Sequence, residues 1–339
     1  MKMKFLGAGS LLLLLSSCDP ADENPHPLAE EKFPVCFSLG LDETVLPFSS
    51  STSGPATKSI PDFSIPEPTP ETDVTEPEGG GDGSGENTPP PDAPEIDQEV
   101  GDLCTQIEYI VYASDGLKEC IKQRHFNRND LNIDFGIVYD TLPAGNYRIV
   151  FIAHSSKTAV LTDRKLTFDA LSDIFYASAQ PTIGTGQTLS QDFTLARIVS
   201  QIEFVSTDPL PTGQQTFSIA VDRYPNTLDL ENGQGIASAQ PVSFTYTFTA
   251  DDVGKTGRRH AFFSLIPAGN GTLDLQLTAT DGKGNPTRQR TLSGVRPLAN
   301  RILRYTGRLY SFSDTDNTFN LNIDHNGKWD EPLEEELPD

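Results

Sequence analysis

The clearest pattern along the chain is a strict alternation of apolar and polar residues over short stretches, which is the period of a half-buried β-strand. The first stretch spans residues 33–41, and one face carries Phe33, Val35, Phe37, Leu39 and Leu41. Pro34 indicates that this strand lies at a sheet edge or begins there, because proline has no N–H to donate to a ladder. No amphipathic helix of any length appears, so we predict an all-β fold.

The alternation returns strongly at residue 103. Residues 103–111 and 117–123 predict a hairpin around the turn signal Ser114-Asp115-Gly116. A further strand is predicted over 131–139, with Ile133, Phe135, Ile137 and Tyr139 on one face, and another over 147–153. Residues 169–177 are predicted to form a short helical or irregular piece.

The second half follows the same plan. Strands are predicted at 189–195, 198–204, 217–221, 242–248, 261–265, 273–277, 302–310 and 318–325. Many short strands with turns at this spacing favour antiparallel β-sandwiches.

Two short matches relate the halves. Gln106-Ile-Glu-Tyr109 is similar to Gln201-Ile-Glu-Phe204, and Leu142-Pro-Ala-Gly-Asn146 is similar to Ile266-Pro-Ala-Gly-Asn270, in the same order. We therefore predict two stacked β-sandwich domains, 33–188 and 189–339.

A long insertion interrupts the first domain. Residues 49–102 contain 10 Pro and 7 Gly in 54 positions, together with many acidic residues. Such a composition buries too little apolar surface to offset chain entropy, so we predict a disordered loop. Residues 103–329 carry 22 acidic and 21 basic residues, whereas the whole chain has a net charge of -23. The nearly neutral folded part lacks the basic patch that nucleic-acid binding needs.

The N-terminus has the form of a lipoprotein signal. Lys2 and Lys4 precede an apolar run over residues 5–15, which is too short to span a bilayer, and the run ends in Leu15-Ser16-Ser17-Cys18. We predict a signal peptide over 1–17, lipidation of Cys18 and a tether over 18–32 that holds the protein at the outer membrane. Asp19, Asp22 and Glu23 resemble a surface-export signal of bacterial lipoproteins. An ordinary secretory signal with a chance cysteine is the alternative.

The sequence shows no constellation for catalysis, for a metal ion or for another cofactor. The histidines, at 26, 125, 154, 260 and 325, lie in no zinc or nucleophile motif. Asn322, Asp324, Asn326 and Gly327 match part of a calcium loop, but Leu333 stands where its glutamate is needed.

Cys36, Cys104 and Cys120 allow one disulfide or none, and the simplest interpretation is that they are small core residues. We expect no enzyme activity. A surface glycan-binding lipoprotein remains the alternative function, although the single tryptophan is Trp329, near the tail.

Taken in order, several segments resemble the fimbrial subunit family of type V pili, in particular its fimbrillin-A-associated anchor and accessory branch. They are the lipobox at Cys18, the early strand, residues 107–116, Leu142-Pro-Ala-Gly-Asn-Tyr147, residues 195–202 and residues 300–310. The resemblance implies two transthyretin-like sandwiches and non-enzymatic assembly with other fimbrial subunits by exchange of a β-strand.

The resemblance also implies cleavage at an arginine after the early strand in polymerising subunits. Here no arginine precedes Arg124, which favours an anchor that keeps its lipid; Lys58 is the candidate site for a different protease. Phe319, Leu321 and Ile323 alternate as a donated strand would, or they complete this chain's own second domain, which we favour.

Overall fold

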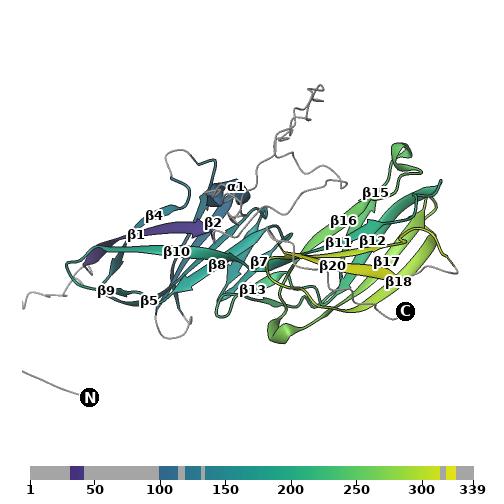
Figure 1. Cartoon of the computed structure of the whole chain (residues 1–339). Helices are drawn as coiled ribbons and strands as arrows, with labels where there is room; N and C mark the ends of the chain where they lie inside the picture. Colours follow the sequence, from purple (N-terminus) through teal and green to yellow (C-terminus); the bar gives the residue numbers. More distant parts are fainter. Residues whose placement is uncertain (1–30, 42–98, 114–118, 131–133, 314–317, 326–339) are drawn as a thin grey trace, which may run out of the picture.

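A computed structural model describes residues 31–41, 99–113, 119–130, 134–313 and 318–325. The regular secondary structure of these residues is almost entirely β-strand, as predicted, and they form two elongated β-structures placed end to end (Figure 1). In the described part of the chain the helical pieces are short: α1 (Val100–Leu103), η1 (Ala250–Asp252) and η2 (Ala268–Asn270). None of them is long and apolar enough to cross a bilayer.

The first sheet has the strand order β3-β2-β5-β8-β10-β1-β4, with β9 paired to β5. Its strands are β1 (Lys32–Leu41), β2 (Gln106–Ala113), β3 (Cys120–Asn127), β4 (Ile137–Pro143), β5 (Gly145–His154), β8 (Ile174–Ala179), β9 (Thr182–Ile183) and β10 (Leu189–Arg197).

This sheet folds over on itself. Phe37 of β1 packs its ring against Tyr109 of β2 and Phe151 of β5, at centroid distances of 5.9 and 5.7 Å. Neither β2 nor β5 is hydrogen-bonded to β1, so these rings meet across the interior and not along the sheet. The alternating apolar faces predicted for β1, β2 and β5 therefore close one hydrophobic core.

Residues 189–195 are predicted to open the second domain, but the strand that they form pairs within the first sheet. β10 runs parallel to β1 from Val35↔Leu189 to Leu41↔Leu195, and its last residues pair with β8. Phe193 and Leu195 belong to the first core. The chain then passes from Arg197 directly into β11, the first strand of the second half.

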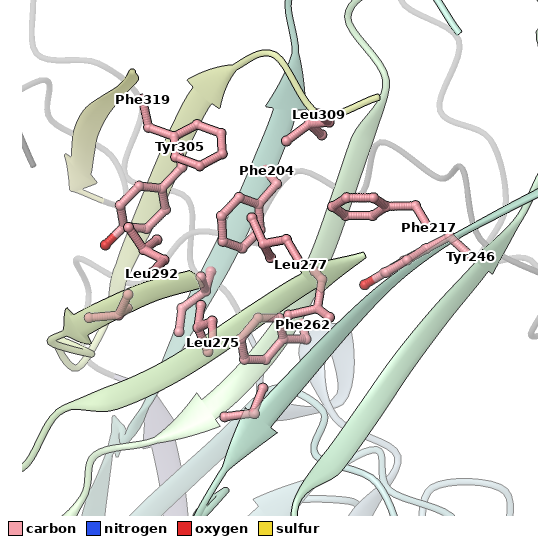
Figure 2. Packing of buried hydrophobic residues seen from close by; sticks show 14 of the residues in the cluster. Phe204, Phe217, Tyr246, Phe262, Leu275, Leu277, Leu292, Tyr305, Leu309 and Phe319 are labelled. Carbon is pink, nitrogen blue, oxygen red and sulfur yellow. The ribbon is translucent and has the colours of Figure 1, made fainter. Parts of the chain in front are cut away.

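The second half contains two four-stranded sheets, β16-β11-β19-β20 and β15-β12-β17-β18. Their strands are β11 (Val199–Ser206), β12 (Gln214–Asp222), β15 (Val242–Thr247), β16 (Arg259–Leu265), β17 (Leu273–Asp281), β18 (Pro286–Val295), β19 (Arg301–Gly307) and β20 (Phe319–His325). Aromatic and leucine side chains from both sheets fill the space between them (Figure 2).

A fourth, small sheet joins the two halves. It has the order β14-β13-β7-β6, where β6 (Ala159–Thr162) and β7 (Lys165–Phe168) come from the first half and β13 (Thr227–Asp229) and β14 (Gln234–Ile236) from the second. Beneath it lies a third apolar cluster that includes Ile152, Phe168, Val199 and Leu265. The halves thus share both a ladder and a core.

A buried ion pair lies at the same joint. Arg197, whose side chain is fully buried, donates from Nε and Nη2 to the two carboxylate oxygens of Asp173, each at 2.7 Å. Its Nη1 donates to Asn300 Oδ1 at 2.8 Å, which links the end of β10 to the loop before β19. Burial raises the pKa of Asp173, an effect that the guanidinium only partly offsets.

Two local predictions were wrong. Residues 169–177 are not a helical or irregular piece throughout, because β8 begins at Ile174. Ile137 and Tyr139 point to solvent, while Val138 and Leu142 are buried in β4.

Of the two positions predicted for Pro34, the second is the observed one. β1 is not an edge strand, since it is flanked on both sides, but Pro34 lies near its start, before the ladder with β10 begins.

Candidate strand-exchange sites

The first candidate site is the position of β1, which we call the β1 slot. β1 is bordered by β10 on one side, in parallel, and by β4 on the other, in an antiparallel ladder from Lys32↔Pro143 to Ser38↔Ile137. Four side chains of β1 point into the core and are buried: Phe33, Val35, Phe37 and Leu39. Without β1, two strand edges and the rings around Phe37 would be exposed, which is the arrangement that accepts an added strand.

The direction of β1 fixes where the chain enters the fold. Because β10 runs parallel to β1 and ends at the joint, the Leu41 end of β1 faces the second half. The start of β1, the purple strand, lies on the side of the first half that faces away from the second half (Figure 1). Cys18 and Lys58 both lie outside the described residues. In sequence, Lys58 falls between β1 and α1, so a cut there would leave β1 joined to Cys18 and separate from the rest of the chain.

The second candidate site is β20, which contains all three residues named for the tail. β20 pairs with β19 from Gly307↔Phe319 to Arg301↔His325 and has no other strand neighbour in the described part of the chain. Phe319 and Leu321 are buried in the second core, and Ile323 packs at its margin. The ring centroids of Phe319 and Phe204 are 5.8 Å apart. Both side chains are labelled in the packed core of Figure 2. In this structure β20 therefore occupies its own domain, and Asn322 lies in a strand and not in a calcium loop.

The residues that lead to β20 are held by a buried carboxylate. Asp208, 1% exposed, accepts hydrogen bonds from the backbone N–H groups of Leu309, Tyr310 and Ser311 at 2.7–3.0 Å. It also accepts the Ser311 hydroxyl at 2.8 Å. Any movement of β20 must therefore begin after Ser311.

Replacing Gly307 with alanine should loosen β20 selectively. A Cβ at Gly307 would lie 2.5 Å from the Phe319 ring and 2.7 Å from the Thr318 carbonyl oxygen. We expect a loss of about 1–3 kcal/mol in the free energy of unfolding, measured with urea. Gly40→Ala is the matched control, because a Cβ there meets nothing within 4 Å. A melting temperature that stays unchanged after deletion of residues 318–339 would contradict the assignment of β20 to its own domain.

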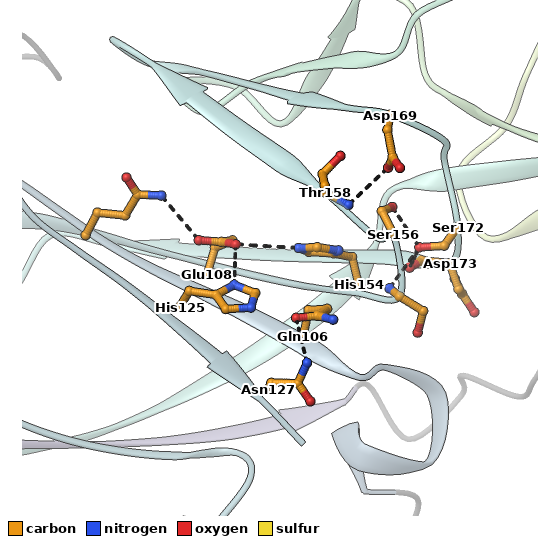
Figure 3. Close-up of polar contacts among 12 residues, drawn as sticks. Gln106, Glu108, His125, Asn127, His154, Ser156, Thr158, Asp169, Ser172 and Asp173 are labelled. Atoms are coloured by element: carbon orange, nitrogen blue, oxygen red, sulfur yellow. Dashed lines mark hydrogen bonds and ion pairs between the residues drawn. The ribbon is translucent and has the colours of Figure 1, made fainter. Parts of the chain in front are cut away.

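A buried polar cluster in the first half was not identified from the sequence (Figure 3). Glu108 is 3% exposed and lies 2.6 Å from Nδ1 of His125 and 3.8 Å from Nε2 of His154. Burial raises the pKa of Glu108, but the contacts with His154 and His125 lower it by more, so the pKa lies below its usual value. His154 is 1% exposed and edge-on to Phe168, which leaves it out of reach of a substrate.

The cluster therefore holds the Glu108 carboxylate in place inside the fold. Among the described residues, no group of three His, Cys, Asp or Glu side chains is arranged to hold a metal ion. Cys36, Cys104 and Cys120 are free thiols, and of these Cys104 is buried and Cys120 exposed. Burial raises the pKa of Cys104 well above that of an ordinary thiol.

The surface features relevant to glycan binding are scattered. Across the described ranges, the exposed aromatic side chains are Tyr139 of β4 and Phe312, which belong to different halves. A hollow of about 490 Å³ lies between Gly213, Gly282 and Thr287, and the ring of Tyr310 beside it is buried. Trp329 lies outside the described residues. No two exposed rings of the described chain form a shared stacking platform.

The chain is similar to several solved structures at low sequence identity. Among solved structures, the chain is similar to the fimbrial anchor protein Mfa2 from Porphyromonas gingivalis, with 12% identity, a TM-score of 0.47 and coverage of 87% of this chain and 99% of that one. A putative adhesin from Bacteroides ovatus gives 8% identity and a TM-score of 0.47, covering 91% and 96% of the two chains. A fimbrial assembly protein from Parabacteroides distasonis gives 10% identity and a TM-score of 0.43, covering 87% of this chain and 96% of that one. A search of curated proteins finds no match.

The sequence itself matches a family model. The model for fimbrillin-A associated anchor proteins Mfa1 and Mfa2 matches residues 94–334, which is well over half of the chain and includes both halves of the fold from α1 onward. The resemblance found in the motifs is thereby confirmed, and the chain belongs to the family of fimbrillin-A associated anchor proteins.

Proposed function

We propose that this protein is a non-enzymatic fimbrial anchor or accessory subunit, tethered to the outer membrane through acylated Cys18 and joined to other fimbrial subunits by exchange of a β-strand. The observation that carries the proposal is the position of β1. The strand nearest to Cys18 in sequence is also an internal strand of the first core, so lipid and fold are connected through one buried segment.

An anchor must keep that connection. Between Cys18 and Lys118 the chain has two basic residues, Lys32 and Lys58, and no arginine, so an arginine-specific protease has no site there. The β1 slot then stays filled by the chain's own strand. Cleavage at Lys58 would instead free the slot for a strand from another subunit and favour a shaft or tip role.

In this arrangement the second half provides the segment that joins the next subunit. β20 is an edge strand held by one neighbour and carries the alternating apolar residues that a slot of this kind accepts. We propose that β20 completes its own domain in the isolated chain and is the segment lent to the next subunit in the fimbria.

Replacing Cys18 with alanine should remove the protein from the outer-membrane fraction. Each buried CH₂ of an acyl chain contributes about 0.8 kcal/mol, and two or more chains are needed for stable attachment. The measurement is cell fractionation, with mass spectrometry of the mature N-terminus. Cys120→Ala, which removes an exposed thiol, is the control and should fractionate like the unaltered protein.

Retention of the Cys18→Ala protein in the outer membrane would contradict the tether. Purification of the unaltered protein with a ladder of fimbrial subunits is the corresponding test of assembly. Retention on a polysaccharide column without any such ladder would favour glycan binding instead.

A further inference from the structure

β4 controls lateral access to the β1 slot. It borders β1 on the side away from β10, and within the described chain it has a backbone partner on that one side. Since β1 lies between β4 and β10, another strand can replace β1 only if the ladder between β1 and β4 opens. What holds β4 in place therefore decides whether the slot is open.

Side chains of the facing sheet fasten β4. Lys122 of β3 donates from Nζ to both carboxylate oxygens of Asp140 at 2.7 and 2.9 Å, and the Tyr109 hydroxyl donates to the same carboxylate at 3.0 Å. Arg124 Nη1 donates to the backbone carbonyl of Tyr139 at 2.9 Å. These contacts join the two terminal strands of the folded sheet, β3 and β4, which share no backbone ladder.

Asp140 is the centre of this arrangement. Its side chain is 8% exposed and that of Lys122 is 29% exposed, so water screens this pair less than it screens a pair on the open surface. Arg124 adds a second positive charge at 3.9 Å. Asp140 also stands opposite Val35 in the ladder, at the middle of β1. Loss of its charge would leave the cations of Lys122 and Arg124 beside β4 without the negative charge that they share.

The contact between β3 and β4, which we call the seam, opens differently from a backbone ladder. A backbone ladder opens only when many hydrogen bonds break along it, whereas the seam between β3 and β4 depends on a few side-chain contacts, to the Asp140 carboxylate and to the backbone carbonyls of Tyr139 and Thr141. Lysine and arginine on an edge strand also discourage pairing with a foreign strand. A seam of this kind both closes the slot and provides a local place at which it can open.

We propose that Asp140 and Lys122 form a latch that holds β4 against β3 and so keeps the β1 slot closed around its own strand. Opening the latch speeds the exchange of β1 for another extended segment with apolar residues at alternate positions. In the proposed anchor the latch keeps the chain's own β1 in place, and a segment of another fimbrial subunit would enter only after a cut at Lys58. That part rests on the proposed function; the latch itself does not.

Hydrogen–deuterium exchange on the full mature chain tests the latch without any partner. Asp140→Asn should raise the exchange rate of the β1 and β4 amides at least tenfold and leave those of β11 unchanged. Lys122→Ala should act in the same direction, and Lys122→Arg, which keeps the cation, should restore slow exchange. Glu231→Gln, which breaks the exposed pair with Arg164, is the matched control and should leave β1 unchanged.

A labelled synthetic peptide with the sequence of residues 31–41 gives a second measurement. It should enter the Asp140→Asn protein faster than the unaltered protein. Unchanged exchange of β1 in Asp140→Asn would overturn the latch, and so would an equal rise in every strand, which is the mark of general destabilisation. Faster β1 exchange in a protein that never purifies with fimbrial subunits would keep the latch and reject the proposed function.

Discussion

Replacing Arg197 with alanine should lower the free energy of unfolding by about 3–5 kcal/mol, because it leaves the Asp173 carboxylate at a buried position without its charge partner. The guanidinium makes two hydrogen bonds to Asp173 and one to Asn300, and its Cζ lies 5.0 Å from the centre of the Phe175 ring. Urea unfolding monitored by circular dichroism measures the loss.

Three variants show whether the loss comes from the stranded charge. Arg197→Lys should recover part of the stability, since an ammonium cannot reproduce the two parallel hydrogen bonds. The double variant Arg197→Ala/Asp173→Ala should lower the free energy of unfolding by less than the sum of the losses in the two single variants. Arg164→Ala, which breaks an exposed pair with Glu231, should cost less than about 1 kcal/mol. Equal losses for Arg164→Ala and Arg197→Ala would contradict the assigned role.

Replacing Phe37 with alanine should lower the free energy of unfolding by a similar amount, about 3–5 kcal/mol. Phe37 is fully buried, and its ring lies 5.6–5.9 Å from those of Tyr109, Phe151 and Phe193. The change leaves a cavity in the middle of the first core and weakens the hold of the sheet on β1. The same unfolding experiment measures it, and hydrogen exchange of the β1 amides should rise at the same time.

Phe312→Ala is the control for that measurement. Its ring is 72% exposed, so its removal should change the free energy of unfolding by no more than about 0.5 kcal/mol. A loss of less than about 1 kcal/mol for Phe37→Ala would mean that β1 is not an integral strand of the core, and the basis of the proposed anchor role would be lost.

Alternation in the sequence predicts those strands that present one face to a core. β1, β5, β12, β17 and β20 lie within a few residues of their expected positions, because an apolar residue at every second position has one stable arrangement in a half-buried sheet. β4 shows how this rule fails. A turn at residues 134–136 shifts the phase by one residue, so that Val138 and not Tyr139 is buried.

Strands that depend on distant partners were missed. β6, β7, β13 and β14 have three or four residues each and form because two halves of the chain meet. β18 lacks apolar alternation. At one of its positions, Arg290 covers the ring of Phe319 in β20, with its guanidinium 3.7 Å from the ring centre. Likewise, β20 could be named as a candidate exchange strand from the sequence, but the β1 slot, the strand partners β10, β4 and β19, and the latch could not. Strand pairing and side-chain contacts across a seam are not local properties.

The direction of β1 has a mechanical consequence for a protein fixed at one end. A tensile load between the N-terminal segment and the second half would draw β1 lengthwise past β10 and β4, so the hydrogen bonds of both ladders would resist together in shear. Were β1 oriented the other way, the same load would peel it off one bond at a time at far lower force. In the proposed anchor, the strand nearest to Cys18 in sequence is therefore inserted in the orientation that best withstands extraction.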